Sequence, residues 1–99
     1  MTYSLHPEAR DDLRDAAKFY RERAGESLSQ SFFAEFEQSV NTLLKHPNLG
    51  LSWRGRGRRR YLMPHFPYSI VYTAAEEEIH ILAVAHHSRR PGYWSRRKR

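Results

Sequence analysis

The side chains best suited to chemistry in this 99-residue chain lie close together near its C-terminal end. An apolar run that begins at Ile79 leads into two adjacent histidines, His86 and His87. Paired arginines and an aromatic pair follow directly: Arg89, Arg90, Tyr93 and Trp94. Histidine titrates near neutral pH, arginine binds phosphate and carboxylate groups, and aromatic rings stack on bases and cations. Because a strand positions side chains more firmly than a loop does, we take this strand end as the candidate functional site.

A second group of cationic side chains precedes the last strands. Five arginines separated by two glycines form this run: Arg54, Arg56, Arg58, Arg59 and Arg60. In a solvated loop or at a strand edge, such a run discourages aggregation, and it also suits a phosphate or an acidic partner. We expect the arginines that lie in the loop to contribute positive charge without a specific contact. Arg60, whose direction a strand would fix, is the more specific contact.

Charge is distributed unevenly along the chain, which has a net charge of +6. Residues 1–53 contain six Lys/Arg and eight Asp/Glu, whereas residues 54–99 contain eleven and three. A cationic half on a near-neutral scaffold indicates a polyanionic partner, either a nucleic acid or an acidic protein. A basic surface that serves solubility alone is the alternative.

Several classes of function are excluded or disfavoured. The chain has no cysteine, so disulfides, thiolate zinc sites and a cysteine nucleophile are excluded. Neighbouring residues on a strand point to opposite faces, so His86 and His87 cannot bind one metal ion together. We therefore expect no metal and no cofactor, with one histidine facing the core and the other available for function. Neither a signal peptide nor a membrane span is evident, so we expect a cytoplasmic protein without a membrane partner.

The periodicity of apolar residues divides the single domain into four segments. Residues 1–6 form a strand, residues 7–46 a helical hairpin, residues 58–88 a β-meander, and residues 89–99 a basic C-terminal tail. Pro7 suits the first turn of the first helix, and Gly25 ends it. Ser27 with Gln30 predicts a capping box at the start of the second helix, which ends before Pro47.

This order predicts an α+β fold, in which a small antiparallel sheet carries the N-terminal helical hairpin on one face (β-α-α-β-β-β). The opposite face carries the arginines, and the strand of residues 79–87, the most apolar, is expected to be central. Phe32 and Phe33 are adjacent in the second helix and cannot both face the sheet. One of them therefore belongs to the core, and the other to an exposed apolar patch that a partner covers.

In this order and at this length, four features resemble the RelE/ParE family of toxins from bacterial type II toxin–antitoxin modules. They are the hairpin with its Phe-rich second helix, the link LKHPNLG at residues 44–50, the strand FPYSIVY at residues 66–72, and the ending IHILAVAHHSRRPGYW at residues 79–94. The resemblance implies a sheet flanked by two helices and a cognate antitoxin, acidic and folding on binding. It also implies growth inhibition by one of two routes: RelE-like members cleave mRNA on the ribosome, and ParE-like members block DNA gyrase.

The residues at the family's nuclease positions favour the ParE-like route. Ser69 and Ser88 stand where RelE-like members have arginine, and Trp94 aligns with a C-terminal tyrosine. The resemblance therefore implies a non-catalytic gyrase inhibitor whose target contacts come from the arginine run and the tail: Arg58, Arg60, Arg89, Arg90, Tyr93 and Trp94. Contacts with the antitoxin are expected from Phe32, Phe33, Arg54 and Arg56.

Two alternatives stay open. A RelE-like, ribosome-dependent mRNA interferase would use His87 for proton transfer, Arg60 and Arg90 for phosphate, and Tyr93 for stacking or proton donation. A non-toxic basic nucleic-acid-binding module needs only the uneven charge.

Overall fold

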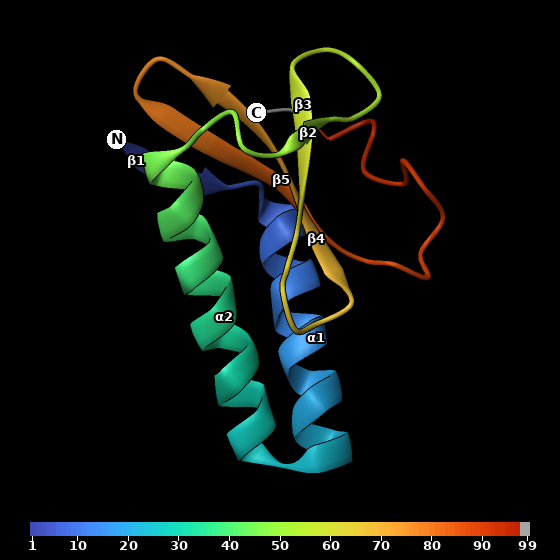
Figure 1. Ribbon diagram of the computed structural model, residues 1–99. Coiled ribbons are helices and arrows are strands. Elements are labelled where there is room, and N and C mark those ends of the chain that lie inside the picture. Colours follow the sequence, from blue (N-terminus) through green and yellow to red (C-terminus); the bar gives the residue numbers. More distant parts are fainter. Residues whose placement is uncertain (98–99) are drawn as a thin grey trace.

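The chain forms two helices and a five-stranded sheet in a computed structural model that describes residues 1–97 (Figure 1). Strand β1 (Thr2–Leu5) comes first, followed by helices α1 (Pro7–Ala24) and α2 (Glu26–Lys45). Four strands complete the fold: β2 (Leu51–Ser52), β3 (Arg58–Leu62), β4 (Tyr68–Ala75) and β5 (Glu78–His86). The strand order across the sheet is β1-β5-β4-β3-β2, so the predicted α+β class is confirmed.

The helical hairpin has a shorter link than the sequence predicts. Pro7 occupies the first turn of α1, where its missing N–H is not needed, and the Nδ1 atom of His6 accepts a hydrogen bond from the Glu8 backbone N–H at 3.0 Å. The predicted capping box of the second helix is wrong. Gly25, at φ +93°, is the C-cap of α1 and also the N-cap of α2, so Ser27 already lies inside the helix and no side-chain cap bond forms among the described residues.

The predicted meander of the last three long strands is confirmed, but the sheet is mixed rather than wholly antiparallel. Strand β1 runs parallel to β5, with Thr2 opposite Glu78, because the chain returns to the sheet through two helices. A short strand, β2, adds to the edge of β3 within residues 47–57, which lie between the predicted hairpin and the predicted meander. The last strand was expected to be central. Strand β5 does have a neighbour on each side, but the middle strand of the five is β4.

The main core lies between the helices and one face of the sheet. Apolar residues of both helices pack there against strands β4 and β5, and they include Leu13, Phe32, Phe36, Val40, Leu43, Tyr68, Ile70, Tyr72, Ile79 and Ile81. As predicted, one of the two adjacent phenylalanines of α2 lies in the core and the other is exposed. Phe32 is fully buried, whereas Phe33 is 38% exposed.

The C-terminal tail covers the opposite face of the sheet. Figure 1 shows the tail, in red, looping away from the end of β5 and returning towards β3. Its Trp94 joins Val71, Leu82 and Ala83 in a second, smaller apolar cluster, with Trp53 and Tyr93 packed around it. The helices therefore cover one face of the sheet, and the irregular C-terminal tail covers the other.

Candidate functional site

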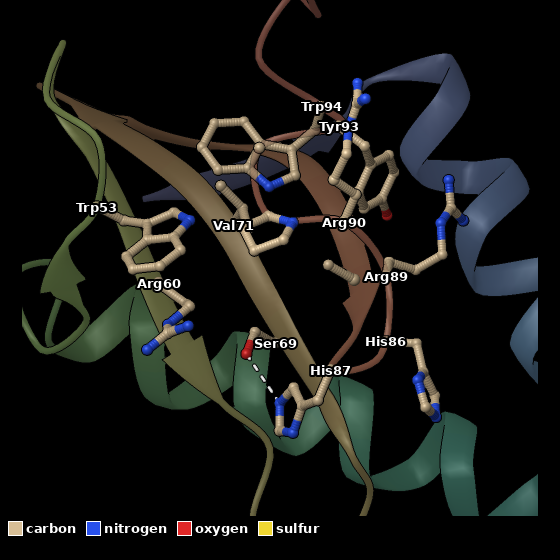
Figure 2. A pocket seen from close by; sticks show the side chains of 13 residues that line it. Trp53, Arg60, Ser69, Val71, His86, His87, Arg89, Arg90, Tyr93 and Trp94 are labelled. Atoms are coloured by element: carbon tan, nitrogen blue, oxygen red, sulfur yellow. Dashed lines mark hydrogen bonds between the residues drawn. The ribbon is translucent and has the colours of Figure 1, made fainter.

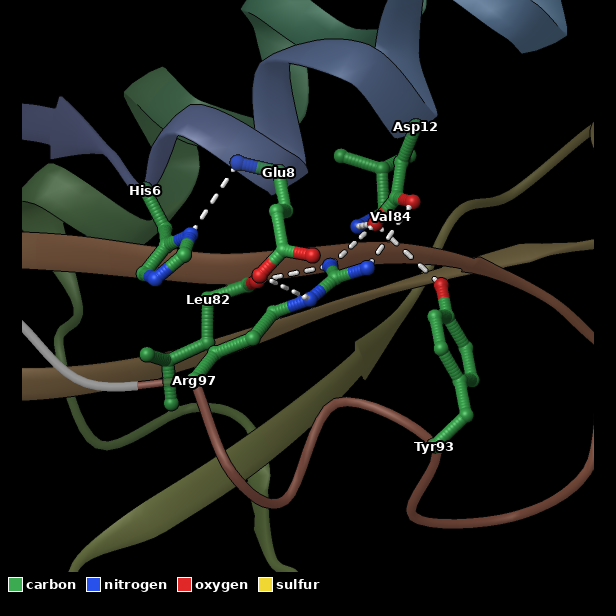
Figure 3. A network of polar contacts seen from close by, with 7 residues as sticks. All are labelled: His6, Glu8, Asp12, Leu82, Val84, Tyr93 and Arg97. Atoms are coloured by element: carbon green, nitrogen blue, oxygen red, sulfur yellow. Dashed lines mark hydrogen bonds and ion pairs between the residues drawn. The ribbon is translucent and has the colours of Figure 1, made fainter.

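The tail is anchored to helix α1 through one buried carboxylate, that of Asp12 (Figure 3). Arg97 donates from Nη1 to Asp12 Oδ2 at 2.6 Å, and the Tyr93 hydroxyl donates to the same oxygen at 3.2 Å. The backbone N–H of Val84 in β5 is a third donor, at 3.1 Å. The side chains of Arg97 and Asp12 are 10% and 8% exposed, so this pair is shielded from solvent. Helix, strand and tail thus meet at a single side chain.

Cation–aromatic stacking holds the tail against β3. Side chains alternate along a strand, so Arg58 and Arg60 share the face that the tail covers. The Arg58 guanidinium lies 5.1 Å from the Trp94 ring centroid and donates from Nη2 to the Ser95 carbonyl at 2.8 Å. Arg60 stacks on Trp53 at 4.0 Å. Planar guanidinium groups stack on aromatic faces in this way while keeping N–H donors at their edges.

A pocket of about 90 Å³ lies between the tail and this face of the sheet (Figure 2). The residues that line it come from the loop between β2 and β3, from β3 and β4, from the end of β5 and from the tail. They include Trp53, Arg60, Ser69, His87, Arg90 and Trp94. The Ser69 hydroxyl and the Nε2 atom of His87 are hydrogen-bonded at 3.0 Å. No acidic residue lines the pocket in the described part of the chain. The pocket is therefore cationic on one side and aromatic on the other.

A larger hollow, of about 420 Å³, lies on the helix side of the same strand end. It is lined by residues of α1 and the end of β5, among them Asp12, Asp15, Phe19 and His86. His86 packs edge-on against Tyr68, and its Nδ1 atom is hydrogen-bonded to the Ser88 side chain at 2.7 Å. The two adjacent histidines therefore face opposite sides of the sheet as predicted, His86 towards the helices and His87 towards the cationic pocket.

The four residues of the nuclease alternative all line the cationic pocket: Arg60, His87, Arg90 and Tyr93. The Tyr93 hydroxyl, however, is bonded to Asp12. Burial, together with the Asp12 charge, raises the pKa of Tyr93 to about 12, although Arg89 and Arg97 oppose the shift. A hydroxyl held in this way is a poor proton donor or acceptor near neutral pH.

The residues predicted to contact a target differ in exposure. Arg89 and Arg90 are exposed, and Arg58 and Arg60 are partly buried. Figure 2 shows Arg89 extending towards α1, and its guanidinium stacks on Tyr93 at 3.8 Å. Trp94 is only 2% exposed, so its ring pins the tail to the sheet and offers almost no surface to a partner.

The residues predicted to contact an antitoxin also differ in exposure. Phe33 is exposed, but Phe32 is fully buried and cannot touch a partner directly. Arg54 and Arg56 are exposed in the loop between β2 and β3, both with φ +58°. Asp12 and Trp53 were not predicted. An aromatic residue beside the arginine run was an available signal for Trp53, whereas nothing local marks Asp12, since its partner Arg97 is 85 positions away.

The fold and the site define a small α+β protein with a cationic, tail-covered sheet face, suited to binding a partner. A family model for the ParE toxin of the type II toxin–antitoxin system parDE matches residues 3–91. The chain therefore belongs to the ParE toxin family. A solved structure of the chromosomal ParDE TA system from P. aeruginosa has the same fold, with a TM-score of 0.75 and 20% identity over 87% of this chain and 95% of that chain.

A comparison with curated proteins gave no match. Among the described residues, neither helix has the length and apolar character needed to cross a membrane.

Proposed function

We propose that this protein is a growth-inhibiting toxin that acts on DNA gyrase and is neutralised by a cognate antitoxin. The observation that carries the proposal is the match of residues 3–91 to the ParE toxin family. The site is consistent with inhibition by binding, because Ser69 and Ser88 stand where the resemblance places arginines in nucleases. A gyrase inhibitor acts where the chromosome is, so the proposal implies action in the cytoplasm.

Target contact is assigned to the exposed edge of the tail. Arg89 and Arg90 are exposed, lie three and four residues after the end of β5, and are not paired with any carboxylate within residues 1–97. Unpaired, exposed guanidinium groups on a firmly anchored segment suit recognition of acidic side chains or phosphates. Arg58 holds the tail to β3 through its contact with Trp94, and Arg60 stacks on Trp53 in the loop before β3.

Antitoxin contact is assigned to the exposed side of the helical hairpin and to the loop between β2 and β3. Phe19 and Phe33 are 45% and 38% exposed on the helical hairpin, which leaves apolar area for a partner to cover. Arg54 and Arg56 add exposed charge at the loop between β2 and β3. An acidic, partly disordered antitoxin that folds on binding would match both features.

A second candidate function is cleavage of mRNA on the ribosome. The observation that favours it is the convergence of Arg60, His87, Arg90 and Tyr93 on one pocket. The bonded Tyr93 hydroxyl argues against it. A basic nucleic-acid-binding module without toxicity is the remaining alternative, and it predicts harmless expression.

The test is inducible expression without antitoxin, followed by pulse-labelling of DNA and protein synthesis in the same culture. We expect DNA synthesis to fall first, with induction of the SOS response, and purified toxin to inhibit supercoiling by gyrase. Early loss of protein synthesis with cut mRNA would instead establish the nuclease. Unimpaired growth with soluble protein present would leave only the binding module.

Two double variants test the contact surface. Arg89→Glu with Arg90→Glu should abolish inhibition of gyrase while antitoxin binding is retained. Arg10→Glu with Arg14→Glu changes the same charge on the exposed outer side of α1 and should leave inhibition intact. If both pairs reduce inhibition equally, net charge and not the tail edge is responsible.

A further inference from the structure

Three exposed leucines lie along the β2–β3 edge of the sheet. Leu51 of β2 is 68% exposed, and Leu62 of β3 is 49% exposed. Leu51 lies opposite Arg60 in the register, and Leu62 follows Arg60 by two positions, so both leucines point to the face that carries the tail. Leu49 is 49% exposed and comes two residues before Leu51. We call these three residues, Leu49, Leu51 and Leu62, the leucine patch.

The backbone beneath the leucine patch is held firmly, although the side chains face solvent. Arg59 donates from Nη1 to the Gly50 carbonyl at 2.7 Å and to the Asn48 carbonyl at 3.2 Å. The Gly50 N–H donates to the Tyr72 hydroxyl at 2.9 Å. These bonds fix the chain on both sides of Leu49, so the exposure of the patch does not come from a loose loop. Apolar side chains that are exposed together on a fixed backbone mark a surface that a protein partner covers.

The surroundings of the leucine patch are cationic. Residues 46–75 contain five arginines and no aspartate or glutamate. None of the five arginines forms an ion pair with a carboxylate within residues 1–97. Arg54 and Arg56, in the loop that joins β2 to β3, are exposed. The patch therefore complements a segment that carries apolar side chains on one side and carboxylates beside them.

Two other occupants match the leucine patch less well. A second copy of the chain would bring the same arginines against one another, and residues 46–75 contain no carboxylate to offset the repulsion. Nucleic acid would meet the arginines, but leucine offers it neither a hydrogen-bond donor nor a ring for stacking. An acidic, amphipathic protein segment satisfies both the apolar and the charged part of the surface.

We infer that the leucine patch binds the apolar side of an acidic, amphipathic segment of the antitoxin, whose carboxylates meet Arg54 and Arg56. The inference rests on the proposed neutralisation by an antitoxin, and it adds a contact on the sheet to those assigned to the helical hairpin. Leu62 lies opposite Ser69, which lines the cationic pocket. A segment bound to the patch therefore lies beside that pocket, on the face of the sheet that carries the tail.

The test is the affinity of the full-length toxin for the purified antitoxin encoded beside the toxin gene, measured by calorimetry. Leu51→Ser with Leu62→Ser should weaken binding at least about tenfold, because the apolar contact is lost. Tyr3→Ser is the matched control, since Tyr3 is 43% exposed on β1, at the opposite edge of the sheet, and it should leave the affinity unchanged. Leu51→Glu should weaken binding more than Leu51→Lys, because an acidic partner repels the added carboxylate.

Two further measurements separate a lost contact from a lost fold. The leucine double variant should still inhibit growth when it is expressed alone, and co-expressed antitoxin should no longer restore growth. NMR of the wild type needs no variant, and the methyl signals of the three leucines should shift when the antitoxin is added. Methyl signals that stay unchanged in the saturated wild-type complex would overturn the inference, even if a variant failed to fold.

The remaining outcomes distinguish this inference from the proposed function. If the leucine double variant binds the antitoxin as tightly as the wild type does, the inference is wrong and the proposed function stands. If the wild type does not bind the antitoxin, both are wrong. Equal weakening by Leu51→Lys and Leu51→Glu would contradict an acidic partner. A wild-type dimer, or binding of a DNA duplex, that is lost in the double variant while antitoxin binding persists would assign the patch to that other occupant.

Discussion

Arg97 and Asp12, 85 positions apart in the chain, form an ion pair with an Nη1–Oδ2 distance of 2.6 Å. Arg97 also donates to the Leu82 carbonyl at 3.0 Å and lies 3.8 Å from Glu8. The pair joins the last described residue of the tail to the first turns of α1 and to β5. Since the same Asp12 oxygen also accepts from Tyr93, this pair sets the position of the segment that carries Arg89 and Arg90.

Replacement of Asp12 by alanine should release the tail. Removing one partner of a buried ion pair leaves an uncompensated charge, and we expect a loss of about 3 kcal/mol in the free energy of unfolding. Urea denaturation measures that loss, and hydrogen exchange of residues 88–97 measures the release. Asp11→Ala is the matched control, because the Asp11 side chain is 66% exposed and its ion pair with Arg14 is long, at 4.0 Å. This change should lower the free energy of unfolding by less than about 0.5 kcal/mol. Unchanged exchange in the tail of Asp12→Ala would contradict the assigned role.

Trp94 should affect toxicity through the position of the tail and not through contact with the target. Its ring is 2% exposed, so Trp94→Ala should cost about 3–5 kcal/mol and detach the tail. Trp94→Phe keeps an aromatic cover over Val71 and Leu82 and should retain most growth inhibition. Measured toxicity that falls equally in both variants, with a protected tail in the phenylalanine variant, would instead indicate direct contact of the indole with the target.

Gly50 is required by a close approach to Tyr72. A Cβ at position 50 would lie 2.7 Å from the Tyr72 hydroxyl oxygen and 3.1 Å from the Arg60 carbonyl. The Tyr72 hydroxyl accepts from the Gly50 N–H at 2.9 Å and donates to the Pro47 carbonyl at 2.8 Å. We expect Gly50→Ala to lower the free energy of unfolding by about 1–3 kcal/mol through overpacking, as measured by thermal or urea unfolding.

The neighbouring Leu49 provides the control for position 50. It is 49% exposed, so Leu49→Ala should change stability by no more than about 0.5 kcal/mol. Similar losses at the two positions would show that the link after α2 is generally sensitive and that the contact with Tyr72 is not the cause.

His80 should make the fold less stable in mild acid. Burial, with the charge of the nearby His6 adding to it, lowers the pKa of His80 below its usual 6.5. The unfolded chain therefore binds a proton at a higher pH than the folded chain does. The stability that His80 contributes is present above about pH 6.5 and is lost as the pH falls towards the folded-state pKa. Urea midpoints measured from pH 7 to pH 5 should fall less steeply in His80→Gln than in the wild type.

His46→Gln is the control for the acid effect, because His46 is exposed at the end of α2. Its midpoints should follow those of the wild type. A His80→Gln slope that equals the wild-type slope would contradict the assignment of the acid sensitivity to His80.

Local patterns gave the elements correctly where one physical cause dominates. The apolar stripes of α1 and α2 and the β-branched and aromatic runs of β4 and β5 lie where the periodicity predicts. One error concerned the start of α2. Ser27 and Gly25 were both acceptable starts for α2, and the positive φ of Gly25 decided between them.

By itself, the sequence determined the α+β class, the helical hairpin, the meander, the opposite directions of His86 and His87, and the uneven charge. These follow from periodicity and composition, which act over a few residues. Only the tertiary structure decided that β1 runs parallel to β5, that Trp94 is buried, and that Asp12 holds Arg97. Each of these depends on a contact between residues far apart in the chain, and such a contact leaves no periodic trace in the sequence around either partner.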